Sequence, residues 1–346
     1  MAKRSLILLF IGLFFSTNRI KAADQVENSR PLSIFKDARV EGVFADAVAL
    51  PLKCDNSGNI TTRLVANDTM ENFVRISAGG GGATVFSVTG PQIEVDRPRL
   101  IDFASLGPEV FALIEDVEHR PMILRYNSDG RFIDKIEIKR IVKPLQLAAF
   151  DSGEFLISGK EIPESQQATK SETGPFLGIF GADGNLRKRI ELAKDVQTNP
   201  ASSKHSAPDP AYEMALAASV LVMGDDGFAY LMRRANDGPI FKISGEGEVV
   251  ASFRIQPPAG ARNSGLLAVA HGLLAVEFMQ FKPQSTELKS VLLQLIDGFD
   301  GKIVLRAGHA DPAIGPSLAC YDRGEFVFLS AGEDSHFHLI RTTPEK

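Results

Sequence analysis

The 346-residue chain contains no tryptophan, only two cysteines and only six histidines. Without indole rings, a sugar-binding platform built on tryptophan stacking is excluded. Neither CxxC nor HExxH occurs, so the strong local zinc-binding spacings are missing as well. With 44% hydrophobic and 23% charged residues, the composition is that of an ordinary globular protein. No motif in the sequence identifies a reaction.

The first 22 residues have the three parts of a secretory signal peptide. Lys3 and Arg4 precede an apolar run at 5–15, and polar residues then lead to Ala22 and Ala23. The run is about 11 residues long, against the ~20 needed to span a bilayer, so we expect a cleaved signal and not a retained anchor. We predict export to the periplasm or the extracellular space. Residues 23–346 would then form a single domain without a membrane span.

The charge balance argues against polyanionic partners. The chain has 38 Lys+Arg and 43 Asp+Glu, which gives a formal net charge of −5. The signal segment carries four basic residues and no acid, so cleavage takes the net charge to −9. Nucleic acid and anionic membrane surfaces both need a positive footprint. We therefore expect neither as a partner, and expect a protein or a small molecule instead.

One short pattern returns six times along the mature chain: an apolar run, a tight turn ending in Gly, and a second apolar run. The clearest copies are AAFDSGEFLISG at 148–159 and ACYDRGEFVFLSAG at 319–332. The turn glycines are spaced by 45–52 residues, except for one interval of 74 residues; they are Gly58, Gly107, Gly153, Gly227, Gly272 and Gly324. This period indicates a repeat architecture with one long unit.

Each repeat predicts four β-strands. A second signature between the copies consists of an apolar run, an Asp-Gly or Gly-x-Gly turn and an alternating run, as in Val249, Ala251, Phe253 and Ile255. Alternation with period two is typical of a half-buried strand. Four strands per unit, six times, predict an all-β fold, a six-bladed β-propeller. The last unit lacks a fourth strand, which residues 32–46 would supply by closing the ring; alternatively, residues 23–46 form a loose tail.

The units resemble those of six-bladed β-propellers of the NHL-repeat kind, including secreted bacterial propellers without an assigned activity. The resemblance covers residues from about 40 to 343 and rests on the pattern of an apolar run, Asp-x-x-Gly or Asp-x-Gly, and a second apolar run. The regular Asn-x-Arg-[Ile/Val] segment of that repeat is missing here. The resemblance implies a fold and does not imply a chemistry.

If the glycine turns join strands one to two and three to four, all of them lie on one face of the disc. The other face would carry the long polar loops, and binding sites favour such loops on a rigid scaffold. We expect these loops at 66–83, 159–175, 193–214, 257–264, 279–288 and 306–316. The segments 159–175 and 193–214 are the expected contact segments, with passive insertions as the alternative.

Four histidines fall in or next to the expected loops and are candidate binding residues: His119, His205, His309 and His336. His271 is expected in a short turn, and His338 in a strand. The glycine-rich run SAGGGGATV at 77–85 lacks the Lys-Ser/Thr of a phosphate loop and precedes a strand, so we expect a connector. The recurring turn aspartates are explained by capping of the turns.

Cys54 and Cys320 occupy the same place in the first and last units, four residues before the turn glycine. A ring would make these units neighbours, and an exported protein permits a disulfide. Rotational symmetry argues against the bond, because equivalent side chains point in the same sense around the ring. Inner strands are also expected to lie farther apart than the ~7 Å Cα separation that a bridge tolerates. Both outcomes stay open.

We expect a binding function on the long-loop face, without catalysis and without a cofactor. One alternative is a metal-dependent hydrolase or lyase of the lactonase kind, with a divalent metal at the mouth of the central tunnel. A convergence of metal ligands there cannot be read from a linear sequence, so the metal site is unknown. A third possibility is a purely structural or envelope-associated role.

Overall fold

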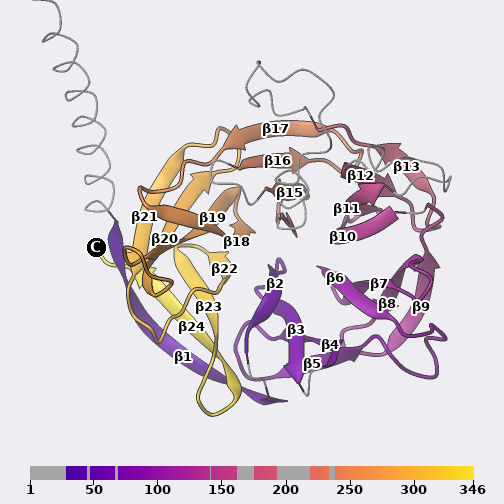
Figure 1. The fold of residues 1–346 in the computed structure, drawn as a ribbon, viewed down its shortest axis with the longest axis horizontal. Coiled ribbons are helices and arrows are strands. Elements are labelled where there is room, and N and C mark those ends of the chain that lie inside the picture. Colours follow the sequence, from indigo (N-terminus) through magenta and orange to yellow (C-terminus); the bar gives the residue numbers. More distant parts are fainter. Residues whose placement is uncertain are drawn as a thin grey trace, which may run out of the picture.

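The computed structural model of the protein describes residues 29–44, 47–66, 69–140, 142–161, 175–192, 219–233 and 238–346. These residues form strands and turns and contain no helix, and hence none long and apolar enough to cross a membrane. The strands form sheets arranged in a ring, as in a β-propeller (Figure 1). The expected signal peptide at 1–22 and the candidate residue His205 lie outside the described residues.

Four separate sheets have four antiparallel strands each, in chain order from the centre to the rim (Figure 1). The first holds β2 (Ala49–Cys54), β3 (Ile60–Ala66), β4 (Thr69–Ile76) and β5 (Ala83–Ser87). The second holds β6 (Arg99–Leu106), β7 (Glu109–Glu115), β8 (Pro121–Tyr126) and β9 (Phe132–Glu137). The third holds β10 (Val142–Ala149), β11 (Phe155–Glu161), β12 (Pro175–Phe180) and β13 (Leu186–Arg189). The fourth holds β14 (Val220–Met223), β15 (Ala229–Met232), β16 (Pro239–Ile243) and β17 (Val249–Arg254).

The remaining strands form one eight-stranded sheet, in the order β18-β19-β20-β21-β1-β24-β23-β22. Its first half holds β18 (Ala261–Ala270), β19 (Leu273–Phe281), β20 (Leu288–Asp297) and β21 (Ile303–His309). Its second half holds β22 (Leu318–Asp322), β23 (Glu325–Ala331), β24 (His336–Pro344) and β1 (Arg30–Phe44).

The sheet count differs from the six separate sheets that the repeats predict. The difference comes from β1, whose first residues pair in parallel with β21, Arg30 with Ala307 and Pro31 with Gly308. This short bridge joins the last two four-stranded units into one hydrogen-bonded sheet.

The six repeat glycines lie in the turns between the first and second strands of the units, where the sequence pattern predicts them. All six have positive φ, from 56° at Gly107 to 90° at Gly324. Residues with a Cβ rarely adopt this conformation, which explains why glycine recurs there. His271 lies in one of these turns and His338 in β24, also as expected.

The expectation of a long loop at 66–83 is wrong, because β4 (Thr69–Ile76) occupies its middle. Phe73, Val74 and Ile76 are fully buried, but the polar residues interspersed with them hide the strand in the sequence. The expected loops at 279–288 and 306–316 are shorter than predicted for the same reason, because β19, β20 and β21 extend into them. The glycine-rich run forms a tight turn between β4 and β5, with Gly80 at a φ of 78°.

The ring is closed by β1, which pairs antiparallel with β24 from Leu32 opposite Pro344 to Phe44 opposite His336. The glycine-rich turn of the first sheet packs on this strand. A Cβ at Gly80 would lie 2.8 Å from the Cβ of Ala38 in β1, so only glycine allows this approach. In addition, Arg341 of β24 donates a hydrogen bond to the carbonyl oxygen of Ala78. The N-terminal strand therefore lies between the two ends of the repeat array.

Deleting residues 23–46 is expected to destabilise the whole ring, because it removes every β1–β24 hydrogen bond and exposes an edge of β24. The measurement is thermal unfolding of the truncated protein against one that lacks only residues 23–28 and keeps β1. Equal melting temperatures for the two proteins would contradict a closing role for β1.

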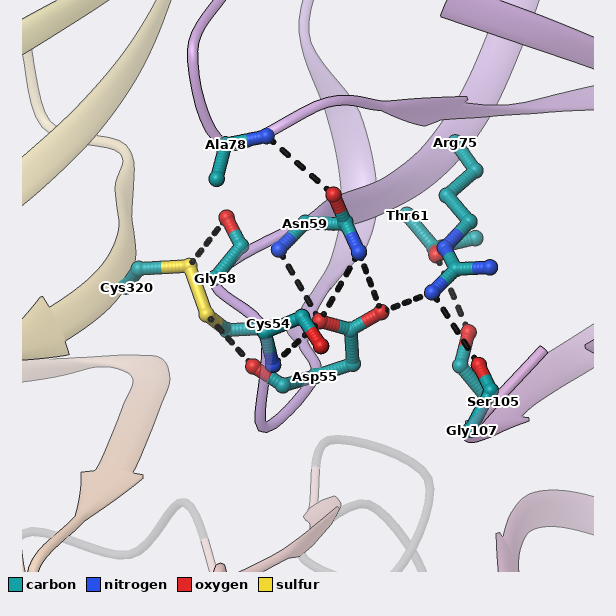
Figure 2. Close-up of polar contacts among 11 residues, drawn as sticks. Cys54, Asp55, Gly58, Asn59, Thr61, Arg75, Ala78, Ser105, Gly107 and Cys320 are labelled. Atoms are coloured by element: carbon teal, nitrogen blue, oxygen red, sulfur yellow. Dashed lines mark hydrogen bonds and ion pairs between the residues drawn. A yellow bond between two sulfur atoms is a disulfide. The ribbon is translucent and has the colours of Figure 1, made fainter.

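A disulfide between Cys54 of β2 and Cys320 of β22 links the first and last units of the ring (Figure 2). The Cα atoms lie 5.3 Å apart, so the expected separation beyond 7 Å is wrong. The innermost strands converge at the axis, and Cys320 reaches the turn of the first unit, where its Sγ lies 3.7 Å from the carbonyl oxygen of Gly58. The bond joins residues 266 positions apart.

Replacing both cysteines by alanine is expected to lower the free energy of unfolding by about 2–4 kcal/mol, because the unfolded chain gains conformational freedom. Chemical denaturation of the oxidised protein and the double variant measures the loss. Thiol titration of the denatured, unreduced monomer should find no free thiol; two free thiols would contradict the bond.

Glu277 of β19 links the two halves of the eight-stranded sheet. Its side chain is fully buried, and Oε2 accepts a hydrogen bond from the backbone N–H of Leu318 at 2.9 Å. Oε1 has no hydrogen-bond partner among the described residues. Burial of the carboxylate raises the pKa of Glu277 to about 7, because the charged form loses its hydration.

This pKa predicts a pH-dependent stability. The folded protein binds the Glu277 proton more tightly than the unfolded chain, whose pKa is 4.5, so the free energy of unfolding should fall as pH rises from 4.5 to about 7. Glu277→Gln keeps an acceptor for Leu318 and should remove a decline on the order of 2–3 kcal/mol. Urea unfolding at several pH values, with the exposed Glu94→Gln as control, measures it. An unchanged slope in Glu277→Gln would contradict the prediction.

Candidate functional site

The first strand of each unit faces the centre of the ring (Figure 1). Between these strands lie two cavities, each of about 240 Å³. One cavity lies at the ends of the strands, next to the glycine turns; we call it the short-turn cavity. The other lies at the starts of the strands, on the face of the expected long loops; we call it the long-loop cavity. Lys53 and Leu221 line both. The axis therefore has two compartments with shared walls.

A buried ion pair separates the two compartments. Lys53 of β2 donates to Asp102 Oδ2 of β6 at 2.6 Å and to the carbonyl oxygen of Leu147 in β10 at 2.8 Å. The backbone N–H of Leu147 donates to the same Asp102 oxygen at 2.7 Å. Burial lowers the pKa of Lys53 and raises the pKa of Asp102, and their mutual attraction opposes both shifts. These contacts tie three neighbouring sheets together at the axis.

A second cation, Arg63 of β3, lines the long-loop cavity. Its Nη1 donates to the carbonyl oxygen of Leu100 at 3.0 Å, and its Nη2 donates to the carbonyl oxygen of Ile101. Burial lowers the pKa of Arg63, while the charge of Asp102 raises it. The guanidinium is thus held by two main-chain oxygens of the neighbouring sheet.

The wall of the long-loop cavity continues into the third and fourth sheets with polar groups. Gln146 of β10 donates through Nε2 to the carbonyl oxygen of Ser219 at 2.6 Å, and the hydroxyl of Ser158 donates to Gln146 Oε1. Both Gln146 and Ser219 line the cavity. The rest of the wall is apolar and includes Leu50, Leu145 and Leu266. The long-loop cavity therefore combines a charged floor with an apolar wall.

Three aspartates line the short-turn cavity, Asp55, Asp151 and Asp225, and two of them, Asp55 and Asp225, have side-chain partners. Asp55 caps its own turn, where Oδ1 accepts from the N–H groups of Ser57 and Asn59 at 2.9 Å, and it forms an ion pair with Arg75 (Figure 2). Capping explains this aspartate, as the sequence predicts.

Asp225 has a different role, which the sequence does not reveal. It accepts from the backbone N–H of His271 in the adjacent sheet at 2.8 Å through Oδ2, and His271 Nε2 lies 2.7 Å from Asp322 Oδ1. His271 thus bridges acidic groups from two neighbouring units.

The structure does not bring the described candidate histidines together. His119 follows β7 and is 75% exposed, with Nδ1 2.6 Å from Glu115 Oε1. His309 ends β21, where its ring packs at 5.3 Å against Phe328, and burial lowers its pKa to about 4.

His336 begins β24 and is buried. Its Nε2 lies 2.9 Å from Arg39 Nη2, and its ring lies 4.7 Å from that of Phe44. Each of the three histidines therefore has its own set of neighbours. Among the described residues, no group of three or more His, Cys, Asp or Glu side chains is placed to hold a metal ion.

Sequence reasoning missed Lys53, Asp102 and Arg63, although a signal for the first two exists. Lys53 and Asp102 both stand five residues before their turn glycines, at the same place in consecutive units. The equivalent residues of the other four units are apolar, namely Ala148, Val222, Leu267 and Ala319. Opposite charges at an otherwise apolar repeat position indicate an ion pair between neighbouring inner strands. Arg63 has no such signal, because its contacts are with main-chain oxygens.

No family model matches the chain, and no curated protein matches it in sequence. Among solved structures, similarity extends to a protein of unknown function from Bacteroides caccae, with 13% identity, 78% of this chain and 84% of the other covered, and a TM-score of 0.44. Virginiamycin B lyase from Staphylococcus aureus gives 11% identity, 91% and 100% coverage, and a TM-score of 0.44. The WD40 domain of Pan2 from Neurospora crassa gives 11% identity, 92% and 97% coverage, and a TM-score of 0.44. At these values the likenesses carry no argument about activity.

Proposed function

We propose that the chain is a six-bladed β-propeller of the NHL-repeat kind, in which the two halves of the eight-stranded sheet count as separate blades. Each half has four strands, like each of the four separate sheets. In the strand ladder, the two halves are connected through the short parallel bridge between β1 and β21. The six glycine turns, one for each unit, support the same count.

We further propose that the protein binds a ligand on its long-loop face, at the opening of the long-loop cavity, and acts as a binding scaffold. The observation that carries this proposal is the group of Lys53, Asp102 and Arg63 at the floor of that cavity. Burying charges costs free energy even when they are paired, and well-packed apolar residues often stabilise a core as well or better. Four of the six units use apolar residues at the position of Lys53 and Asp102, so ring packing alone does not require charges there.

The segments 159–175 and 193–214 would contribute to the same face. Residues 162–174 and 193–214 lie outside the described residues, so their contact role stays a prediction. The described strands on either side, β11 ending at Glu161 and β12 beginning at Pro175, run between the two faces in the same sense as the other second and third strands. The end of β11 and the start of β12 therefore both lie at the long-loop face.

Export to the periplasm or the extracellular space belongs to the same proposal, and the Cys54–Cys320 disulfide supports it, because such bonds persist in oxidising compartments. No specific contact among the described residues favours the alternative, a metal-dependent hydrolase or lyase. Elemental analysis of the purified protein, together with a lactone and ester hydrolysis screen, tests that alternative directly.

The short-turn cavity and the long-loop cavity can be compared as ligand sites by filling each of them with an indole ring. Leu145→Trp should occlude the long-loop cavity, whereas Ser57→Trp should fill the short-turn cavity at an exposed turn position. In a thermal-shift screen of small molecules, ligands that stabilise the unaltered protein should lose their effect in Leu145→Trp and keep it in Ser57→Trp. The reverse pattern would place the site at the short-turn end and contradict the proposal.

A further inference from the structure

The long-loop cavity carries an uncompensated positive charge. Lys53 and Asp102 neutralise each other through their 2.6 Å contact. Arg63 has no carboxylate within ion-pair distance among the described residues, whereas its neighbours Arg75 and Arg99 form ion pairs with Asp55 and Glu115. The three charged side chains that line the cavity therefore sum to one positive charge at neutral pH.

The environment of Arg63 favours an anion over water as its partner. Its two hydrogen bonds to carbonyl oxygens leave further guanidinium N–H groups without an acceptor among the described residues. A partly buried guanidinium interacts strongly with a planar oxyanion, because two parallel N–H groups match two oxygens. Asp102 raises the pKa of Arg63 through its charge, but it forms no hydrogen bond or ion pair with the guanidinium: its Oδ2 accepts from Lys53 and Leu147, and its Oδ1 has no hydrogen-bond partner among the described residues.

The lining of the long-loop cavity indicates the chemistry and size of the rest of the ligand. Leucines and Val220 surround the charged floor of the cavity. A ligand with an anionic group and a short apolar body would therefore place the anion at the floor and bury the body against these apolar side chains. A cavity of about 240 Å³ accommodates roughly eight non-hydrogen atoms at the ~30 Å³ that a water molecule occupies in the liquid.

We propose that the long-loop cavity binds a small monocarboxylate with an apolar body, and that Arg63 anchors its carboxylate. This inference rests on the proposed function and names the chemical class of its ligand. No covalent step is involved. Lys53 and Asp102 form the floor and position Arg63 against Leu100 and Ile101 by tying β2 to β6.

The test uses hexanoate as the probe, with hexanamide and hexylamine as neutral and cationic controls of the same length, measured by isothermal titration calorimetry on the full mature protein. Hexanoate should bind, and both controls should bind at least about tenfold more weakly, because they lack the oxyanion. Arg63→Gln should weaken hexanoate binding at least about tenfold, Arg63→Lys should retain part of it, and the exposed Arg131→Gln should leave it unchanged. Equal binding of hexanoate and hexanamide by the unaltered protein overturns the proposal without any variant.

The outcomes separate this inference from the proposed function. If Arg63→Gln melts like the unaltered protein and binds hexanoate equally well, the anchor is wrong. No hexanoate binding at millimolar concentration also overturns the inference. If a neutral or cationic molecule binds to the unaltered protein and not to Leu145→Trp, the proposed site on the long-loop face is supported and only the proposed ligand class is wrong. Binding that depends on Ser57 instead rejects both.

Discussion

Closure of the ring is the constraint on which the rest of this structure depends. A four-stranded sheet of this size buries its faces only against neighbouring sheets, so the first and last units must meet although the whole chain separates them. Here β1 pairs with β24, and the Cys54–Cys320 disulfide joins β2 to β22. The strand acts at the rim and the disulfide acts at the axis. Together they hold the junction between the first and last units both at the rim and at the axis of the ring.

Polar side chains near the axis also connect each sheet to a neighbouring one. Lys53 and Asp102 connect the first three sheets, Gln146 connects the third to the fourth, and Glu277 connects the two halves of the last. Asp102, Gln146 and Glu277 each bond to the backbone at the innermost strand of the next unit, while Lys53 bonds to the Asp102 side chain and to the carbonyl oxygen of Leu147. Innermost strands of neighbouring units have no ladder of hydrogen bonds between them, so their main-chain groups need side chains as partners. The inner wall is therefore specified by polar side chains as well as by apolar packing.

The sequence was sufficient for the parts of the fold that repeat. Period-two alternation and positive-φ glycines are local properties, and they predicted the all-β class, the turns and the strand supplied by the N-terminus. The strand β4 was missed because polar residues interrupt its apolar side, and the merging of the last two units depends on a two-residue bridge that has no sequence signature. The three described histidines chosen from loop positions have separate neighbours, because proximity to a loop does not determine which way a side chain faces. Arg63 could not be found, since a bond to a main-chain oxygen leaves no pattern.

The short-turn cavity and the long-loop cavity differ in whether the charged side chains named here have ionic partners within the protein. At the short-turn end, Asp55 is held by its own turn and by Arg75, and Asp225 is held by His271 of the adjacent unit. These carboxylates stabilise turns and seams, so binding a cation there would compete with bonds that hold the ring. At the long-loop end, Arg63 donates hydrogen bonds only to carbonyl oxygens, and the nearby charge of Asp102 forms no ion pair with it, so the proposed carboxylate would add a partner without displacing one. A ligand at this end gains a full ionic partner, and the ring loses no contact of its own.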